Sequence, residues 1–185
     1  MKLVVIDYES GNLRSVSRAL ESQGVTPMVT GDASEFGDAD AMILPGVGSG
    51  LSAMDALNQR NLVDPIRDYI SSERPFLGVC LGLQLLLDRT EEGDTPCLGV
   101  VPGDTKLLPA GLKVPPMGWN SVTFKDDTAN RHPVLAGIPD DSFFYFVHSY
   151  YADPELKEVV VGTTTYGVEF CSAVAWDNVM AVQFH

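Results

Sequence analysis

Apolar residues in the first half of the chain come in short continuous runs, each about as long as a strand. Continuous runs of this kind are typical of strands that are buried on both faces of a parallel sheet. The runs are KLVVID (2–7), VTPMVT (25–30), ADAMILPGV (39–47) and PFLGV (75–79). They predict four strands of one central sheet.

The stretch after the first run predicts a helix. Leu13, Val16 and Leu20 recur at helical spacing. Asn12 stands directly before them as a candidate N-cap, and Gly24 follows them as a candidate helix end. A strand, a helix and a second strand in this order are the pattern of a doubly wound α/β sheet.

Two further stretches predict helices. Residues 52–72 predict one or two, and Pro65 suits the first turn of the second, with Asp64 as its cap. The segment LGLQLLLD (81–88) predicts the opening of another helix. Its leucines lie on all sides, which is typical of a helix that is buried all round.

The pattern changes beyond residue 105, where short apolar runs are separated by Pro, Gly and Asp. Several runs alternate between apolar and polar residues, which favours antiparallel strands. No repeat or linker separates the two halves. We therefore predict a single α/β domain over residues 1–185, with a mostly parallel central sheet flanked by helices and an antiparallel β extension.

Charge and composition exclude several classes of function. The chain has 185 residues, with 12 Lys and Arg against 25 Asp and Glu. The resulting net charge of −13 repels nucleic acid and anionic membrane surfaces. Three cysteines without a CxxC pair fit a reducing cytoplasm better than a disulfide framework. We therefore expect a cytoplasmic protein. No His/Cys cluster has metal-ligand spacing, so we expect no metal or cofactor.

The junction between the fourth strand and the helix that follows it carries a cysteine. Cys80 lies between Gly78 and Gly82, and G-x-C-x-G between a strand and a helix has the form of a nucleophile elbow. A Cβ at either glycine would collide with the neighbouring strand or helix. The helix amides favour the thiolate, which is the reactive form. The alternative is a buried structural cysteine, which is common.

Gln84 favours the elbow over the structural alternative. It lies one helical turn beyond Cys80, so its amide is expected near the same opening. A lone polar residue in a leucine-rich turn needs a partner, and a bound polar ligand would supply one.

A cysteine nucleophile needs a base, and the chain has three histidines. His132 lies in a polar turn and is expected to be an exposed loop residue. His148 lies in an aromatic strand, either as a core histidine or beside a site. His185 follows the run VMAVQF, and ligands gather at the carboxyl ends of parallel strands, which favours His185 over His148.

The segment GVCLGLQL (78–85) resembles the nucleophile motif of class I glutamine amidotransferases, whose fold is flavodoxin-like. The resemblance implies that Cys80 attacks the side-chain amide of glutamine and that His185, in NVMAVQFH, is the triad histidine. It further implies that Gln84, Ser149 and Tyr150 hold the substrate; for the last two, strand packing remains the alternative.

The same resemblance gives a role to the glycine-rich turn PGVGSG (45–50). As a phosphate cradle the turn lacks P-loop spacing, whereas backbone amides aimed at an oxyanion explain it better. The amide of Leu81 is one expected donor, because it follows the nucleophile. The family resemblance implies that the other lies at Val47–Gly48.

Three further stretches resemble one branch of that family, the glutaminase subunits of imidazole glycerol phosphate synthases. They are IDYESGNLRSV (6–16), LPGVGSG (44–50) and VPPMGWNSV (114–122). The resemblance implies a heterodimer with a (β/α)8-barrel cyclase subunit, which receives the ammonia. It departs at Pro116, where the family usually has His. Gly11, Asn12 and Trp119 are the candidate partner contacts. The alternative for Trp119 is a Trp folded over the sheet, and Gly11 and Asn12 lie at a strand end that could face the active site instead.

In the family the triad histidine is followed by Pro and by the Glu that orients it, whereas the given sequence ends at His185. The loss of such an orienting acid lowers turnover by several orders of magnitude. We therefore expect this form to be impaired as a glutaminase. Alternatives from the sequence are the glutaminase that feeds pyridoxal phosphate synthesis and a binding module without turnover. The ESGN and MGWN segments oppose the first, and the intact Cys80 opposes the second.

Overall fold

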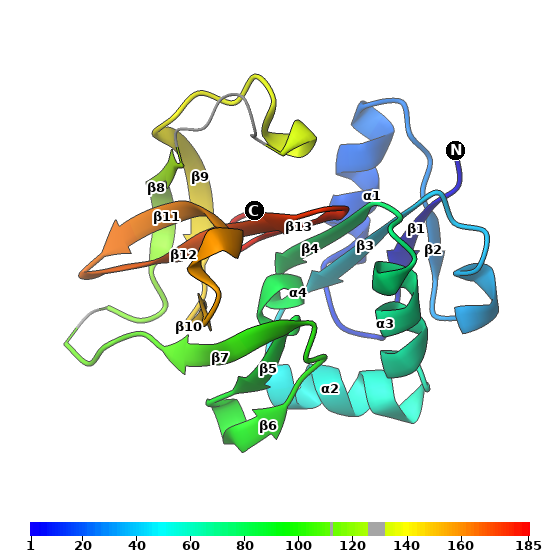
Figure 1. The fold of residues 1–185 in the computed structure, drawn as a ribbon, viewed down its shortest axis with the longest axis horizontal. Helices are drawn as coiled ribbons and strands as arrows, with labels where there is room; N and C mark the ends of the chain where they lie inside the picture. The colour runs from blue at the N-terminus through cyan, green and yellow to red at the C-terminus, as the bar shows by residue number, and fades with distance from the viewer. Residues whose placement is uncertain (112, 126–131) are drawn as a thin grey trace.

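The computed structural model describes residues 1–111, 113–125 and 132–185, and these form a mixed α/β structure (Figure 1). One long sheet runs through the described part, in the order β2-β1-β3-β4-β13-β12-β10-β7-β5-β6, with β11, β8 and β9 continuing from β12. The predicted fold class is confirmed: a mostly parallel centre is extended by antiparallel strands.

The parallel centre contains the four predicted strands and one strand from the end of the chain. Its strands are β1 (Leu3–Ile6), β2 (Met28–Thr30), β3 (Ala41–Gly46), β4 (Phe76–Cys80) and β13 (Val179–Val182). β4 lies between β3 and β13 and is parallel to both. The carboxyl ends of these three strands therefore meet at one edge, which is where ligands bind in such sheets.

The rest of the sheet comes from the second half of the chain. Its strands are β5 (Leu87–Thr90), β6 (Thr95–Pro96), β7 (Val101–Leu107), β8 (Met117–Phe124), β9 (Ser142–Val147), β10 (Tyr150–Pro154), β11 (Val160–Tyr166) and β12 (Val168–Trp176). Most pairs are antiparallel, and β5–β7 is the parallel exception. The predicted antiparallel extension is therefore present.

Helices cover both faces of the parallel centre, as Figure 1 shows. The longer ones are α1 (Leu13–Ser22), α2 (Gly50–Gln59) and α3 (Val63–Ser71), and single turns are α4 (Leu81–Gln84), η1 (Ala33–Glu35), η2 (Glu92–Asp94), η3 (Pro133–Leu135) and η4 (Lys157–Val159). β1 alternates between two cores: Val5 packs with α1, whereas Val4 belongs to the core beneath α2 and α3.

The helix ends agree with the sequence prediction in one case and differ in another. Asn12 caps α1, because its side-chain oxygen accepts a hydrogen bond from the backbone of Ser15 at 3.3 Å. α3, however, begins at Val63, so Asp64 lies inside its first turn and does not cap it. Leu62 occupies the cap position and makes no side-chain cap bond.

The predicted helix over 81–88 is wrong beyond its first turn. α4 ends at Gln84, and β5 begins at Leu87. The carbonyl oxygens that would continue the helix are taken by another segment. Leu85 accepts from the amide of Leu98, and Leu86 accepts from the amides of Val100 and Val101, at the start of β7, at 2.8–2.9 Å. The leucines are buried as predicted, but they lie in a turn and a strand.

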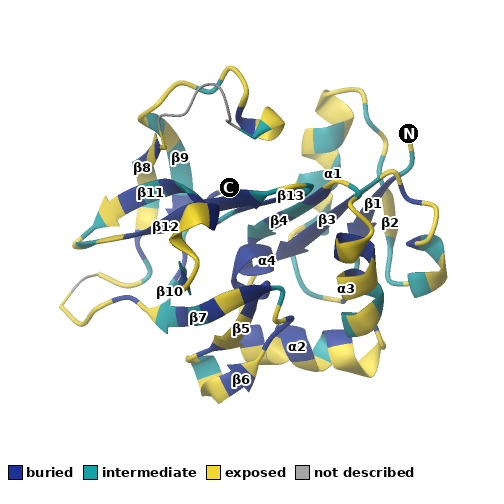
Figure 2. Ribbon diagram, viewed as in Figure 1, coloured by how far each residue is buried: buried dark blue, intermediate teal, exposed yellow. Residues whose placement is uncertain are grey.

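Buried residues concentrate in the sheet and on the inward faces of the helices, whereas loops and outer helix faces are exposed (Figure 2). Val4, Ile6, Met42 and Leu44 are fully buried in the parallel centre. No helix among the described residues is long and apolar enough to cross a membrane.

Candidate active site

Cys80 lies at the junction of β4 and α4 in a strained backbone conformation. Its φ is 56° and its ψ is −106°, a region that residues with a side chain rarely occupy. A nucleophile elbow uses such strain to raise the reactive atom above the strand ends. The sulfur is close to the surface but largely covered, because the residue is only 6% exposed.

The two glycines around Cys80 are required by close packing, as predicted. A Cβ on Gly82 would lie 2.0 Å from the carbonyl oxygen of Leu44 in β3. A Cβ on Gly78 would lie 2.9 Å from the carbonyl oxygen of Gly82 and 3.0 Å from Ala181 in β13. The first distance is far below van der Waals contact, so α4 can lie on β3 only if residue 82 is a glycine.

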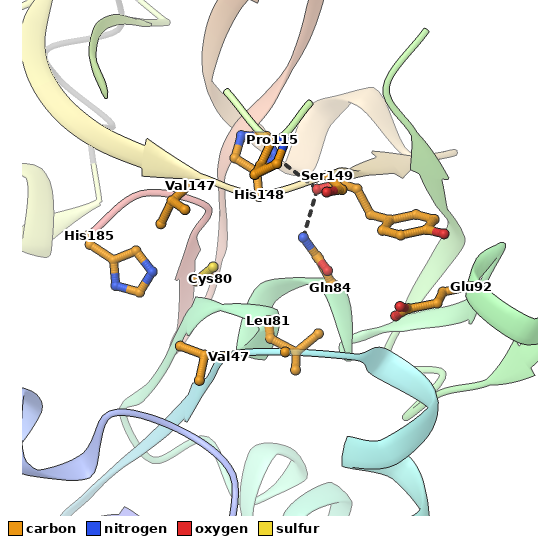
Figure 3. A pocket seen from close by; sticks show the side chains of 12 residues that line it. Val47, Cys80, Leu81, Gln84, Glu92, Pro115, Val147, His148, Ser149 and His185 are labelled. Carbon is orange, nitrogen blue, oxygen red and sulfur yellow. Dashed lines mark hydrogen bonds between the residues drawn. The ribbon is translucent and has the colours of Figure 1, made fainter. Parts of the chain in front are cut away.

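A cavity of about 400 Å³ opens beside Cys80 at the carboxyl ends of the strands (Figure 3). It is lined by Val47, Gly48, Cys80, Leu81, Gln84, Glu92, Pro115, Val147, His148, Ser149, Tyr150 and His185. Eight of these were assigned from the sequence to catalysis, oxyanion binding or substrate binding. The structure brings these eight residues together from four separate segments of the chain.

The three candidate partner contacts lie outside this cavity. Asn12 borders a neighbouring groove of about 350 Å³, which shares Val47, Val147 and His185 with the cavity. Trp119 is 71% exposed on β8 and makes an edge-to-face contact with Tyr145 of β9, with ring centroids 6.0 Å apart. The alternative of a Trp folded back over the sheet is therefore wrong.

Burial dominates the electrostatics of Cys80. It raises the pKa of the thiol to about 11, against the lowering effects of the Leu81 amide and the Gln183 side chain. The sequence led us to expect that helix amides would favour the thiolate. They act in that direction, but α4 is a single turn and desolvation outweighs them.

The two histidines near the cavity differ in environment. His185 follows β13, its backbone amide donates to Tyr145 at 2.9 Å, and partial desolvation lowers its pKa. His148 is 5% exposed, and burial lowers its pKa to about 4. Its Nδ1 lies 2.8 Å from the carbonyl oxygen of Tyr150, which can only accept. Nδ1 therefore carries the proton, and His148 stays neutral near pH 7.

Gln84 is held by protein groups more completely than the sequence suggested. Its Nε2 donates to the carbonyl oxygen of Tyr150 at 2.7 Å and to Oε1 of Gln183 at 3.0 Å (Figure 3 draws the first bond). Both amide protons are thus committed. The residue can contact a ligand in the cavity only through its oxygen, as an acceptor.

Two polar residues at the site were not predicted from the sequence. Glu92 lines the cavity, and its Oε2 accepts from the backbone of Gly50, at the first turn of α2, at 2.6 Å. The acidic pair Glu91–Glu92, placed a short distance after the elbow, was the available signal. Gln183 is fully buried and donates to the Cys80 sulfur at 3.6 Å. Its only signal was a polar residue within the apolar run before His185.

Comparison with protein-family models places residues 4–185 in the family "Glutamine amidotransferase class-I". Among curated proteins, the "Imidazole glycerol phosphate synthase subunit HisH" of Rhodopirellula baltica is 48% identical over 186 residues, covering 99% of this chain and 88% of the relative. The protein of the same name from Aquifex aeolicus is 46% identical, covering 100% of this chain and 88% of the relative.

Solved structures with the same fold include PurLQS from Thermotoga maritima, with a TM-score of 0.77, 18% identity and coverage of 100% of this chain and 86% of that one. A second, described as a glutamine amidotransferase, has a TM-score of 0.75 and 18% identity over 98% of this chain and 89% of that one. At this level of identity the likeness concerns the fold.

Proposed function

Because the chain belongs to the class-I glutamine amidotransferase family, we propose that it is the glutaminase subunit of an imidazole glycerol phosphate synthase, which acts in histidine biosynthesis. It hydrolyses L-glutamine to glutamate and ammonia through a thioester on Cys80. The observation that carries this proposal is the convergence of Cys80, His185 and two candidate oxyanion donors on one cavity.

Substrate binding uses the polar groups around the cavity. The carboxylate of Glu92 is suited to the α-ammonium group of glutamine, because it is fixed by the first turn of α2 and retains a second oxygen. Ser149 and Tyr150 border the same cavity and hold the amino-acid part of the substrate together with the oxygen of Gln84.

Thioester formation begins when His185 takes the proton of the Cys80 thiol and the resulting thiolate attacks the carboxamide carbon. The carbonyl oxygen gains negative charge, which the backbone amides of Gly48 and Leu81 stabilise. His185 gives a proton to the departing nitrogen, and ammonia leaves. Water, deprotonated by the same His185, then attacks the thioester carbon, so that glutamate departs and the proton returns to the sulfur.

The released ammonia passes to a (β/α)8-barrel cyclase, with which the chain forms a heterodimer. The cyclase converts a phosphoribulosyl formimino-carboxamide ribotide into imidazole glycerol phosphate and an aminoimidazole carboxamide ribotide. Support for a docking face comes from exposed apolar side chains on β8: Met117 is 65% exposed and Trp119 is 71% exposed. The groove at Asn12 shares lining residues with the catalytic cavity, which supports Asn12 and the preceding Gly11 as partner contacts. Three free cysteines suit a cytoplasmic location.

The test compares glutamine with free ammonium as the nitrogen source for the reconstituted cyclase. We expect the wild-type chain to support a measurable glutamine-dependent reaction, even at the reduced rate expected from the sequence, and Cys80→Ser to abolish it while the ammonium-dependent reaction continues. Cys171→Ser is the matched control, because this cysteine lies away from the cavity. Equal glutamine-dependent rates for wild type and Cys80→Ser would overturn the proposal.

A further inference from the structure

A chain of buried hydrogen bonds connects the Cys80 sulfur to the strand on the far side of the cavity. The side-chain amide of Gln183 donates to Cys80 Sγ at 3.6 Å, and its oxygen accepts from Gln84 at 3.0 Å. Gln84 also donates to the carbonyl oxygen of Tyr150 at 2.7 Å, which accepts a further bond from His148 at 2.8 Å. Gln183 is fully buried, and Gln84 and His148 are 7% and 5% exposed.

These hydrogen bonds can be oriented in only one consistent way. The carbonyl oxygen of Tyr150 cannot donate, so Gln84 must present its NH2 group to it. The second proton of that NH2 group points to Gln183, which must therefore present its oxygen. The NH2 group of Gln183 is then directed at the sulfur. Turning Gln183 over would oppose two NH2 groups in a buried position, which is unfavourable.

We propose that Gln183 is a further catalytic residue of the glutaminase site: its side-chain amide, held in one orientation by Gln84 and the carbonyl oxygen of Tyr150, donates a hydrogen bond that stabilises the Cys80 thiolate. Gln84 acts through Gln183 and is a positioning residue. The proposal deepens the proposed function, on which it rests for the identity of the substrate.

The need for such a donor follows from the burial of the nucleophile. The sulfur is removed from water, and a charged thiolate in this position requires hydrogen bonds to replace those of the solvent. The backbone amide of Leu81 is one donor and Gln183 is the other. Because the side-chain amide is neutral, it stabilises the charge without repelling the imidazolium that forms when His185 holds a proton.

The first test measures iodoacetamide alkylation of Cys80 between pH 7 and pH 10 in the full chain, resolved by peptide mass spectrometry. Gln183→Met removes the donor at similar volume, and we expect the thiolate fraction to fall about tenfold. The more basic thiolate is intrinsically more nucleophilic by about threefold, so the alkylation rate falls about threefold. Gln183→Glu places an acceptor at the sulfur and should lower the rate further.

The other titratable groups around the sulfur are unchanged in these variants. They are Tyr8, Glu92, His148 and His185. A merely structural role for Gln183 predicts the opposite result, because a loosened site exposes cysteines and speeds their alkylation. The buried Cys97 and Cys171 report such loosening in the same samples. An unchanged or faster rate at Cys80 in Gln183→Met would overturn the proposal.

Gln84→Met tests the orienting role and keeps the proposal testable if Gln183→Met does not fold. It leaves the Gln183 amide in place but frees it to rotate. We therefore expect alkylation of Cys80 to be slower than in wild type, as in Gln183→Met; an unchanged rate contradicts the orienting role. In the complex with the cyclase, Gln183→Met should lower kcat for glutamine with little change in KM. If wild type releases no ammonia from glutamine, the proposed function fails, whereas the alkylation series still decides the role of Gln183.

Discussion

The side chain of Cys80 is subject to opposing effects within a few ångströms. Burial favours the neutral thiol, while the Leu81 amide and the Gln183 side chain favour the thiolate. Burial prevails, and the pKa of about 11 leaves a small thiolate fraction near pH 7. A thiol of this kind is protected from oxidation, because oxidation proceeds through the thiolate.

This balance predicts the pH dependence of the isolated chain. The folded pKa of Cys80 is raised, so the thiolate fraction grows about tenfold per pH unit below pH 11. We expect alkylation of Cys80 by iodoacetamide to rise throughout the range from pH 7 to pH 10. A rate that reaches its plateau below pH 8 would contradict the buried, protonated thiol. Peptide mapping separates Cys80 from the other two cysteines.

A second residue-scale prediction concerns Gly82. The Cβ of Gly82→Ala would overlap the carbonyl oxygen of Leu44, so β3 and α4 must separate, and we expect a loss of about 3 kcal/mol in the free energy of unfolding. Gly37→Ala is the matched control, since a Cβ there meets no atom within 4 Å. It should change stability by less than about 0.5 kcal/mol. Urea denaturation measures both, and equal losses would contradict the packing argument.

Single residues could be predicted from the sequence where a local pattern defines them. Cys80 was found because its two glycines lie close to it in the chain, and the packing reason given for them holds at both positions. Gln183 was not found, because its partner Cys80 is 103 positions away and only the pairing of β4 with β13 brings the two together. Long-range partners of this kind leave no local signal.

At the scale of elements, the stretch after Cys80 shows where periodicity fails. Leucines on all sides indicate burial, but burial on all sides is equally compatible with a strand in a core. The choice is made by backbone partners: residues 98–101 return to the carbonyl oxygens of Leu85 and Leu86, and α4 stops. The sequence predicted the burial of this segment and could not predict which segment would pair with it.

The hairpin of β8 and β9 leads to a prediction about the partner. Trp119 pairs with Tyr145 across the hairpin, and its indole is largely exposed, as expected for an interface anchor. We expect Trp119→Ala to weaken binding to the cyclase by at least about tenfold. Calorimetric titration of the chain with the proposed cyclase partner measures this change.

Met28→Ala is the control for that measurement. Met28 is also an exposed apolar side chain, but it lies on β2, an end strand of the sheet that does not pair with β8 or β9. It should leave the affinity for the cyclase unchanged. Equal affinities for wild type and Trp119→Ala would remove Trp119 from the docking face.

At the scale of the whole molecule, the fold class followed from the change in pattern near residue 105. The continuous runs became β1, β3 and β4, and the alternating runs became the antiparallel extension. The strand order did not follow: β13 comes last in the chain, yet it lies next to β4 in the parallel centre. That placement brings His185 to the carboxyl end of β4, where Cys80 lies.

Three buried thiols predict how the stability of the whole molecule depends on pH. Burial raises the pKa of Cys80 and Cys97 to about 11 and that of Cys171 to about 12. A raised folded pKa contributes stability below the unfolded value of 9.0, and this contribution is lost as the pH rises through the folded pKa. We expect the ionisation of each thiol in the unfolded state to lower the free energy of unfolding by about 1–2 kcal/mol by pH 10.5.

Urea denaturation under reducing conditions, at pH 8 and at pH 10.5, measures this loss. Cys171→Ala removes one of the three thiols, so its stability should decline less steeply with pH than that of wild type, whatever its absolute stability. An identical decline in the two proteins would show that the Cys171 thiol does not contribute to the loss of stability at high pH.

One small contact near the cavity has a wider consequence. The hydroxyl of Ser10 donates to the carbonyl oxygen of Val47 at 2.9 Å, so the loop that carries Gly11 and Asn12 holds one end of the peptide bond whose other end is the candidate oxyanion donor, the Gly48 amide. A protein that presses on residues 10–12 therefore acts on the orientation of that peptide. Thermodynamic linkage makes the effect mutual: by whatever factor docking changes the affinity for glutamine, bound glutamine changes the affinity for the docked protein. The hydrogen bond from the Ser10 hydroxyl thus couples the surface at residues 10–12 to the glutamine site, although no ligand contacts both.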